Sequence, residues 1–348
     1  MEVPLQSEVS IAHQLTAILS GTGFAPLDEA AWIRVSGEHR TRWLNGILTN
    51  SIQALEPGRG CYNFALNAQG RILGDMNVFA PPDDPDALLI QTGRSQVNSL
   101  IAHLDHYIIM DDVELADISG QFHGLTVVGP NAASVLRHME LPIPEKPLTM
   151  QSASWKDWRV RIIQGHSPLI PRYEVWSEQP GMDALQKSVA GFALKLHNDA
   201  LECLRVLEGT PRYGVDIRNT DKAHDLPQET TQQGETSRAL HFAKGCYLGQ
   251  EIVERVRSRG NVHRAFSGFE LTGALPPQGT ALRADGKTAG ELTTVAAIPL
   301  PKGTLQLGLG YVRREALERR LPLEYPGGAA KPVALPYRIA AADLLSNI

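Results

Sequence analysis

The densest chemical signal in the chain is the segment KGCYLGQEIVERV, which runs from Lys244 to Val256. It places one thiol, Cys246, between a glycine and a tyrosine, with Lys244 two residues before it. The residues from Gln250 onward have helical character, so Cys246 precedes a helix N-terminus. A nearby lysine and a helix N-terminus both lower a thiol pKa from its ordinary value of about 8.5. The pattern fits a reactive thiolate and, equally well, a structural cysteine buried in a tight turn.

The helix expected from Gln250 to Gly260 carries charged residues that continue into the next segment. Glu251 and Arg255 have the i,i+4 spacing that favours an ion pair on a helix. The basic side chains of this region are Arg255, Arg257, Arg259, His263 and Arg264. They could form a solvated helix face and loop, or meet an anionic ligand such as a polyglutamate tail or an RNA phosphate.

A second candidate residue is Asp75, which follows the glycine turn in NAQGRILGDM and is expected at the end of a strand. A carboxylate there can accept a hydrogen bond from a ring N–H or an amine of a ligand, or satisfy local main chain. The segment LRVLEGTPRYGVDI adds Arg205, Glu208, Tyr213 and Asp216. Taken alone, surface ion pairing is the simpler explanation for this second group.

The bulk composition argues against several functional classes. A net charge of −5 over 348 residues disfavours a large general nucleic-acid surface. The three cysteines, Cys61, Cys203 and Cys246, are far apart and have neither disulfide nor zinc spacing, so we expect no metal site and a reducing, cytoplasmic location. We identify no signal peptide, membrane span, dinucleotide loop, P-loop, nucleophile elbow or HExxH motif.

The elements that must position these residues follow from hydrophobic periodicity and turn residues. The first block is expected to contain helices over 8–20 and 95–109, a short helix near Trp43, and strands over 32–35, 60–66, 71–80, 86–93 and 112–119. The second is expected to contain strands over 122–128 and 172–178 and helices over 131–139, 181–190 and 197–208, the last stopped by Gly209.

Because both blocks mix helices and strands in a similar order, we predict an α+β fold made of two related units, over 1–119 and 120–260. From about Val262 the texture changes to short alternating strands with glycine and proline turns, and Asp285–Gly286 is a hairpin signal. Residues 261–348 are therefore predicted to form a small β-barrel domain.

The octapeptide KGCYLGQE, followed by RVRSRGNVHR, resembles the signature of the YgfZ family of folate-binding proteins. These proteins are relatives of the glycine cleavage T-protein, an aminomethyltransferase. The resemblance extends over most of the chain, through WIRVSGEHRTRWLNG, LRVLEGTPRYGVDI, LPQE and the C-terminal GLGYVRRE. It implies a ring-like arrangement of two α+β units and a β-barrel around a central channel.

The resemblance also implies a function and a set of site residues. It implies tetrahydrofolate, or a folate derivative, in the channel, and a role in assembly or repair of iron–sulfur clusters that supports enzymes such as those modifying tRNA. Cys246 matches the key cysteine of the octapeptide, and Lys244 would favour its anion. Asp75 matches a T-protein carboxylate that faces the folate amine. We predict folate contacts at Asp75, Arg205, Tyr213, Glu229, Gln250 and Glu251.

Two departures separate this chain from the T-protein pattern. The T-protein has an acidic pterin contact where this chain has Leu207, and the glutamate here is Glu208. A shift of one residue turns a helical side chain by about 100°. The T-protein also lacks the cysteine motif. The main hypothesis is therefore a folate-binding accessory factor for iron–sulfur proteins. The alternatives are a tetrahydrofolate-dependent aminomethyltransferase or methyltransferase, and a scaffold that binds RNA or protein through the basic segment.

Overall fold

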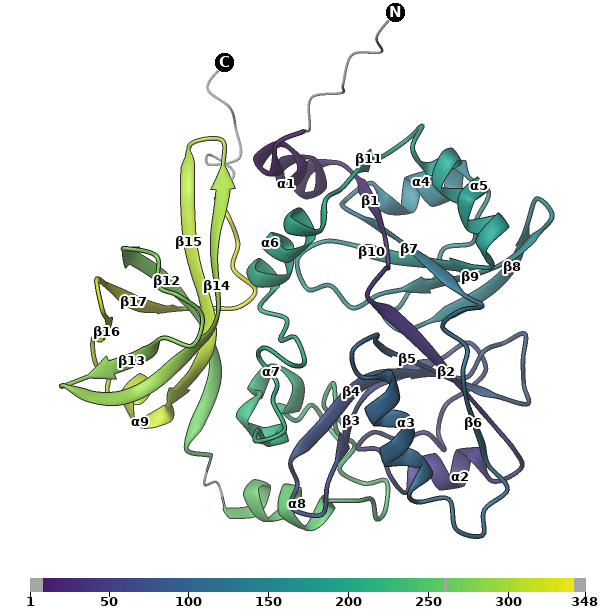
Figure 1. Cartoon of the computed structure of the whole chain (residues 1–348), viewed down its shortest axis with the longest axis horizontal. Coiled ribbons are helices and arrows are strands. Elements are labelled where there is room, and N and C mark those ends of the chain that lie inside the picture. The colour runs from purple at the N-terminus through teal and green to yellow at the C-terminus, as the bar shows by residue number, and fades with distance from the viewer. Residues whose placement is uncertain (1–8, 260–261, 341–348) are drawn as a thin grey trace, which may run out of the picture.

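The computed structural model describes residues 9–259 and 262–340, which form three bodies around a common centre. Figure 1 shows two α+β units on one side, a β-barrel on the other, and the short helix α7 (Pro227–Thr230) in the middle. One hydrophobic core joins the bodies, with Phe64, Leu204 and Phe266 fully or almost fully buried in it. Among the described residues, no helix combines the length and apolar character needed to cross a membrane.

The first unit is a five-stranded sheet with the strand order β3-β4-β5-β2-β6. Its strands are β2 (Ala30–Ser36), β3 (Gly60–Leu66), β4 (Ile72–Phe79), β5 (Leu88–Gly93) and β6 (Glu114–Asp117). Its helices are α2 (Arg40–Asn45) and α3 (Val97–Asp105). The turn predicted between β3 and β4 is confirmed: the Gly70 N–H donates to the Asn67 carbonyl at 2.8 Å, and Gly70 has a φ of 70°.

The second unit is a six-stranded sheet with the order β11-β1-β7-β10-β9-β8. Its strands are β1 (Gly23–Pro26), β7 (His123–Val128), β8 (Met150–Trp155), β9 (Trp158–Gln164), β10 (Arg172–Ser177) and β11 (Leu194–Lys195). Its helices are α4 (Ala132–His138) and α5 (Gln179–Val189). The hairpin of β8 and β9 has no counterpart in the sequence-based prediction.

The two sheets repeat one chain order, which confirms the prediction of two related units. Each runs strand, helix, two hairpin strands, strand, helix, strand, from β2 to β6 and from β7 to β11. The difference is β1, which lies between β7 and β11. The predicted first unit of 1–119 is therefore wrong at its start, because α1 (Ile11–Ser20) and β1 lead into the second sheet.

A connecting region links the second sheet to the barrel. It contains α6 (Asn198–Glu208), the 3₁₀ turn η1 (Ala223–Asp225), α7 and α8 (Gln250–Arg259). Gly209 ends α6 in the left-handed conformation, with a φ of 69°, as its sequence predicts. The expected helix end at Gly260 lies outside the described residues. α8 lies beside the first unit, where the Ile252 side chain packs over Gly70.

The C-terminal body is a closed six-stranded barrel with the order β12-β15-β14-β13-β16-β17, as expected. Its elements are β12 (Arg264–Gly273), β13 (Ala281–Ala284), β14 (Lys287–Leu300), β15 (Gly303–Arg313), α9 (Arg314–Glu318), β16 (Leu323–Tyr325) and β17 (Gly328–Val333). Asp285 and Gly286 both have positive φ and form the predicted hairpin turn between β13 and β14.

Candidate functional site

Asp75 lies in the middle of β4, where two neighbours fix its carboxylate. The Tyr62 hydroxyl donates to Oδ2 at 2.8 Å, and the Gln96 amide donates to Oδ1 at 2.8 Å. Burial raises the pKa of Asp75 above its ordinary value, and these hydrogen bonds and nearby Arg238 oppose the rise. The expected position at a strand end is wrong, because β4 runs on to Phe79.

Asp75 lines a cavity of about 270 Å³. Most of the wall belongs to the first unit, and one residue comes from the second sheet. The lining residues are Glu29, Ala30, Tyr62, Asp75, Met76, Asn77, Gln91, Thr92, Gly93 and Glu174. The wall is polar, with three carboxylates and no lysine, arginine or histidine among its residues.

The residue from the second sheet is Glu174 of β10, and two hydrogen bonds hold its carboxylate. Gln91 Nε2 and Trp176 Nε1 both donate to Glu174 Oε2, at 2.6 and 2.9 Å. Trp176 packs edge-on against Trp32 and Phe79, with ring centroids 5.5 and 5.6 Å apart. Burial raises the pKa of Glu174. A glutamate between Tyr173 and Val175 in a buried strand is the sequence signal that could have identified it.

Arg238 connects the cavity to α7. Its guanidinium lies 4.3 Å from the centroid of the Tyr62 ring and forms an ion pair with Glu229, which is 2% exposed. Burial raises the pKa of Glu229, and Arg238 opposes that rise. The Nε of Arg238 is buried and has no hydrogen-bond partner. Glu229, a predicted folate contact, is thus brought close to the Tyr62–Asp75 pair, while Arg238 was missed.

Glu208 belongs to a neighbouring cluster and does not line the cavity. It accepts a hydrogen bond from the Ser167 hydroxyl and lies 3.8 Å from Arg172, whose Nε is buried without a partner. Leu207 is fully buried in the core that joins the three bodies. Burial, together with the charges of Arg238 and Arg172, lowers the pKa of His166 to about 4, so this histidine is neutral at physiological pH.

Tyr213 lies beside β4, two residues from the position of Asp75. Its hydroxyl donates to the Leu73 carbonyl at 2.6 Å and contacts the Asn219 side chain. Burial, reinforced by the charge of Asp75, raises the pKa of Tyr213 to about 12. The neighbouring Asp221 carbonyl accepts a hydrogen bond from the Ile72 N–H at 3.0 Å. The connecting region is therefore hydrogen-bonded to the first residues of β4.

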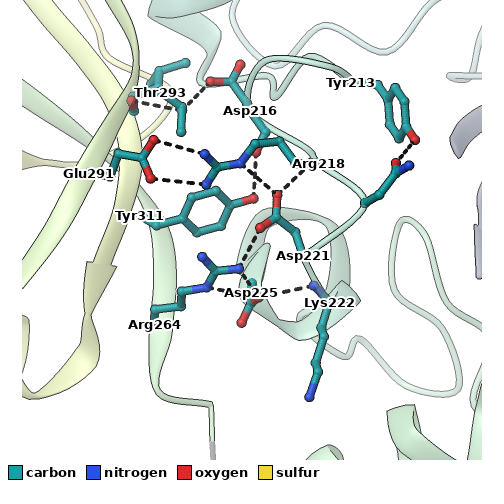
Figure 2. A network of polar contacts seen from close by, with 12 residues as sticks. Tyr213, Asp216, Arg218, Asp221, Lys222, Asp225, Arg264, Glu291, Thr293 and Tyr311 are labelled. Carbon is teal, nitrogen blue, oxygen red and sulfur yellow. Dashed lines mark hydrogen bonds and ion pairs between the residues drawn. The ribbon is translucent and has the colours of Figure 1, made fainter. Parts of the chain in front are cut away.

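The same region is fastened to the barrel by the polar network drawn in Figure 2. Arg264 donates to buried Asp221 at 2.6 Å and to Asp225 at 2.8 Å, while its guanidinium stacks over the Tyr311 ring. Arg218 pairs with Glu291 of β14 at 2.9 Å. Arg264 therefore serves as an interface residue and is not free to meet an anionic ligand.

Arg205 is engaged by protein partners on all sides. Its guanidinium donates to Glu202, to the Thr210 carbonyl, to Asp216 at 2.8 Å and to Thr294 of the barrel at 3.1 Å. Asp216 is fully buried and also accepts from Thr293 and Thr294, at 2.6 and 2.7 Å. The structure places this predicted folate contact at the junction of α6 with the barrel, away from the cavity lining.

Cys246 is exposed, in a turn between Gly245 and Gly249, which both have a φ of 81°. A Cβ at Gly249 would lie 2.6 Å from the Asn67 carbonyl oxygen, so this position requires glycine. The adjacent Tyr247 is 7% exposed and packs into the core. The turn is therefore held to the core by Tyr247, and the Cys246 thiol, four residues before α8, is exposed to solvent.

Lys244 anchors this turn to the first unit. Its ammonium donates to the Leu48 and Asn50 carbonyls, both at 2.6 Å, and lies 5.2 Å from the Tyr247 ring centroid. Burial lowers the pKa of Lys244 to about 8. The titratable group near it is the Cys61 thiol, whose pKa burial raises to about 11. No hydrogen bond joins Lys244 to Cys246 within the described residues. The expectation that Lys244 stabilises the Cys246 thiolate is therefore not supported by a direct contact.

The remaining predicted residues lie on α8. Gln250 is its first residue, and the exposed Glu251 side chain pairs with Arg255 at 2.5 Å, as the spacing predicts. Arg257 pairs with Glu254 at 3.1 Å. The side chain of Arg259 lies outside the described residues. The paired arginines match the solvated-face interpretation better than an anion-binding strip. Within residues 9–259 and 262–340, no group of three or more His, Cys, Asp or Glu could hold a metal ion.

Two family models match this chain. The GCVT N-terminal domain matches residues 5–173, and the CAF17 C-terminal β-barrel domain matches residues 262–337. The first covers the five-stranded sheet, including Asp75, and the second sheet as far as the start of β10, so that Glu174 lies one residue beyond the matched range. The second coincides with the closed barrel.

Individual relatives are distant but extend over most of the chain. A mitochondrial iron–sulfur cluster assembly factor IBA57 homolog of Mycosarcoma maydis is 23% identical, over 89% of this chain and 78% of that protein. An aminomethyltransferase of Frankia alni is 25% identical, over 86% of this chain and 79% of its own length. The crystal structure of the glycine cleavage system aminomethyltransferase T from Bartonella henselae superimposes with a TM-score of 0.78 at 18% identity, covering 96% and 91% of the two chains.

Proposed function

We propose that this chain, which combines a GCVT-like aminomethyltransferase-type core with a CAF17-type C-terminal barrel, is a folate-binding accessory factor for iron–sulfur proteins. In this proposal the Asp75 cavity holds tetrahydrofolate or a derivative. The exposed Cys246 meets the client protein or its cluster. The octapeptide KGCYLGQE supports a position on the YgfZ side of the superfamily, and enzymes that modify tRNA are among the expected clients.

The observation that carries the cofactor proposal is the composition of the Asp75 cavity. A reduced pterin offers several N–H donors, and the wall supplies the Asp75 carboxylate, the Glu174 carboxylate and Asn77 Oδ1, which is buried without a partner. When bound, folate would supply one-carbon chemistry, while this chain's residues orient the ring and exclude water.

The placement of Cys246 supports an outward-facing role. The thiol is exposed, it is not part of the cavity lining, and Lys244 and Tyr247 hold its turn against the first unit. Such a residue can contact a partner protein without rearrangement of the core. The free state of all three cysteines fits the reducing cytoplasm that we propose as the location. The similarity to an IBA57 homolog, an iron–sulfur cluster assembly factor, supports the choice of client.

A complementation experiment tests the cysteine. In a strain that lacks this protein, wild type restores iron–sulfur enzyme activity, and Cys246→Ser is expected to fail at equal protein level. Cys61→Ser is the matched control, because that thiol is part-buried with a pKa of about 11, and it is expected to restore activity fully. Full restoration by Cys246→Ser would remove the cysteine from the mechanism.

Aminomethyl or methyl transfer remains the second candidate, because the Asp75 cavity contains no cysteine and Asp75 alone could serve such chemistry. This alternative predicts a folate-dependent product from an aminomethylated carrier protein or a demethylation substrate. Turnover would then be lost in Asp75→Asn and retained in Cys246→Ser. The accessory-factor proposal predicts no turnover in either protein.

A further inference from the structure

Each side chain of the Asp75 cavity lining that carries a donor uses at least one N–H or O–H group in a hydrogen bond within the protein. Tyr62 donates to Asp75, and Gln91 Nε2 donates to Glu174. Asn77 Nδ2 donates to Gln91 Oε1 at 3.2 Å, and the Thr92 hydroxyl donates to the Asp75 carbonyl at 2.8 Å. Among these side chains, the donors left for a ligand are therefore the second N–H of the Asn77 amide and the second N–H of the Gln91 amide.

Two acceptors of the cavity lining have no hydrogen-bond partner among the described residues. Both protein donors to Glu174 reach Oε2, so Oε1 has no hydrogen-bond partner within the described part of the chain. Asn77 Oδ1 is buried and likewise without a partner. Burying an acceptor without a donor is unfavourable, and a donor from a ligand would relieve it. Asp75 and Glu174 contribute carboxylate oxygens to this wall, and Asn77 Oδ1 adds a third acceptor.

We infer that Glu174 and Asn77 determine ligand specificity. They favour a heterocycle that carries an amino group on the edge facing them over the same heterocycle with an oxo group at that position. An amino group satisfies both free acceptors. An oxo group would place its own lone pairs against a carboxylate. The inference rests on the proposed function, since it takes a pterin-like ring as the occupant of the cavity.

Glu174 fills this role because the glutamate of α6 cannot. Leu207 is fully buried in the core, and Glu208 is engaged by Ser167 and Arg172 outside the cavity lining. The second carboxylate near Asp75 is supplied by the second sheet instead. Its support by Gln91 and Trp176 fixes the direction of the free Oε1 before any ligand binds.

The experiment compares two small probes, pterin and lumazine, which differ in a 2-amino against a 2-oxo group, by calorimetry or fluorescence titration. Wild type is expected to prefer pterin by about 10- to 100-fold, the usual range for one or two hydrogen bonds to a charged acceptor. Glu174→Gln is expected to reduce that preference to less than about threefold. Asn77→Ser, which removes the second acceptor with a smaller side chain, is expected to reduce it partially.

The matched control is Glu178→Gln, an exposed glutamate four residues further along the chain, which is expected to leave the preference unchanged. A parallel titration with 5-formyltetrahydrofolate separates the two claims. Wild type that binds this folate but does not distinguish pterin from lumazine, or folded Glu174→Gln that keeps the full preference, overturns the inference alone. Wild type that binds neither the folate nor pterin overturns the proposed function as well.

Discussion

Replacing Arg205 with methionine separates a structural role from a ligand-binding role. The Arg205 side chain is 13% exposed and pairs with Asp216, whose side chain is fully buried. Methionine keeps much of the aliphatic volume but leaves Asp216 charged and buried with two threonine donors and the Arg212 N–H. Breaking a buried ion pair on one side costs about 3–5 kcal/mol.

For a unit of this size, each 1 kcal/mol corresponds to roughly 2–4 °C in Tm, so Arg205→Met is expected to lower the first unfolding transition by about 10 °C. The matched control is Arg255→Met. Arg255 also pairs with a glutamate on its own helix, but both partners are exposed, so the expected loss is below about 0.5 kcal/mol. The assay is differential scanning calorimetry, followed by 5-formyltetrahydrofolate titration of the folded variants well below their Tm.

If Arg205 has a structural role, Arg205→Met has a lower Tm and a folate affinity within about threefold of wild type. A Tm within 2 °C of wild type would refute the buried-pair argument. A normal Tm with lost folate affinity would instead establish Arg205 as the ligand contact that the sequence predicts. The magnitude rests on the general cost of stranding a buried charge.

Three further outcomes follow from individual side chains. Because burial lowers the pKa of Lys244 to about 8, the unfolded chain binds more protons than the folded chain between about pH 8 and 10.5. Wild type should therefore gain stability with rising pH in this window relative to Lys244→Met. Denaturant midpoints at pH 8 and 10 check this, and a stability difference between the two proteins that does not change with pH contradicts it. Limited proteolysis should cleave Lys244→Met faster than wild type near Cys246, because both carbonyl contacts are lost. Tyr62→Phe should raise the Asp75 pKa further, moving the pH midpoint of folate binding upward; an unmoved midpoint would separate the hydroxyl from the carboxylate.

The parts of the fold that depend on local signals could be predicted from the sequence. The turn between β3 and β4, the end of α6 at Gly209 and the hairpin at Asp285–Gly286 each follow from residues that favour one local conformation. The repeated order of strands and helices was also accessible, because it needs only the sequence of elements. The insertion of β1 between β7 and β11 was not, since pairing partners about 100 or more residues away leave no local pattern.

The candidate site divides in the same way. Asp75 was identified from its position after a turn and its match to a known motif. The contribution of Glu174 depends on how the second sheet packs against the first, which no local pattern encodes. Lys244 illustrates the limit most clearly: it is two residues from Cys246 in sequence, but its hydrogen-bond acceptors are the carbonyls of Leu48 and Asn50, almost 200 residues earlier.

The most direct test of the central claim is calorimetric titration of the purified protein with 5-formyltetrahydrofolate, comparing wild type, Asp75→Ala and Cys246→Ala. Wild type and Cys246→Ala are expected to bind with similar affinity, because the thiol lies outside the cavity lining. Asp75→Ala is expected to bind at least about tenfold more weakly, since it loses a charged acceptor. No heat of binding with wild type, or equal affinity for Asp75→Ala, would contradict the assignment of the Asp75 cavity as the folate site.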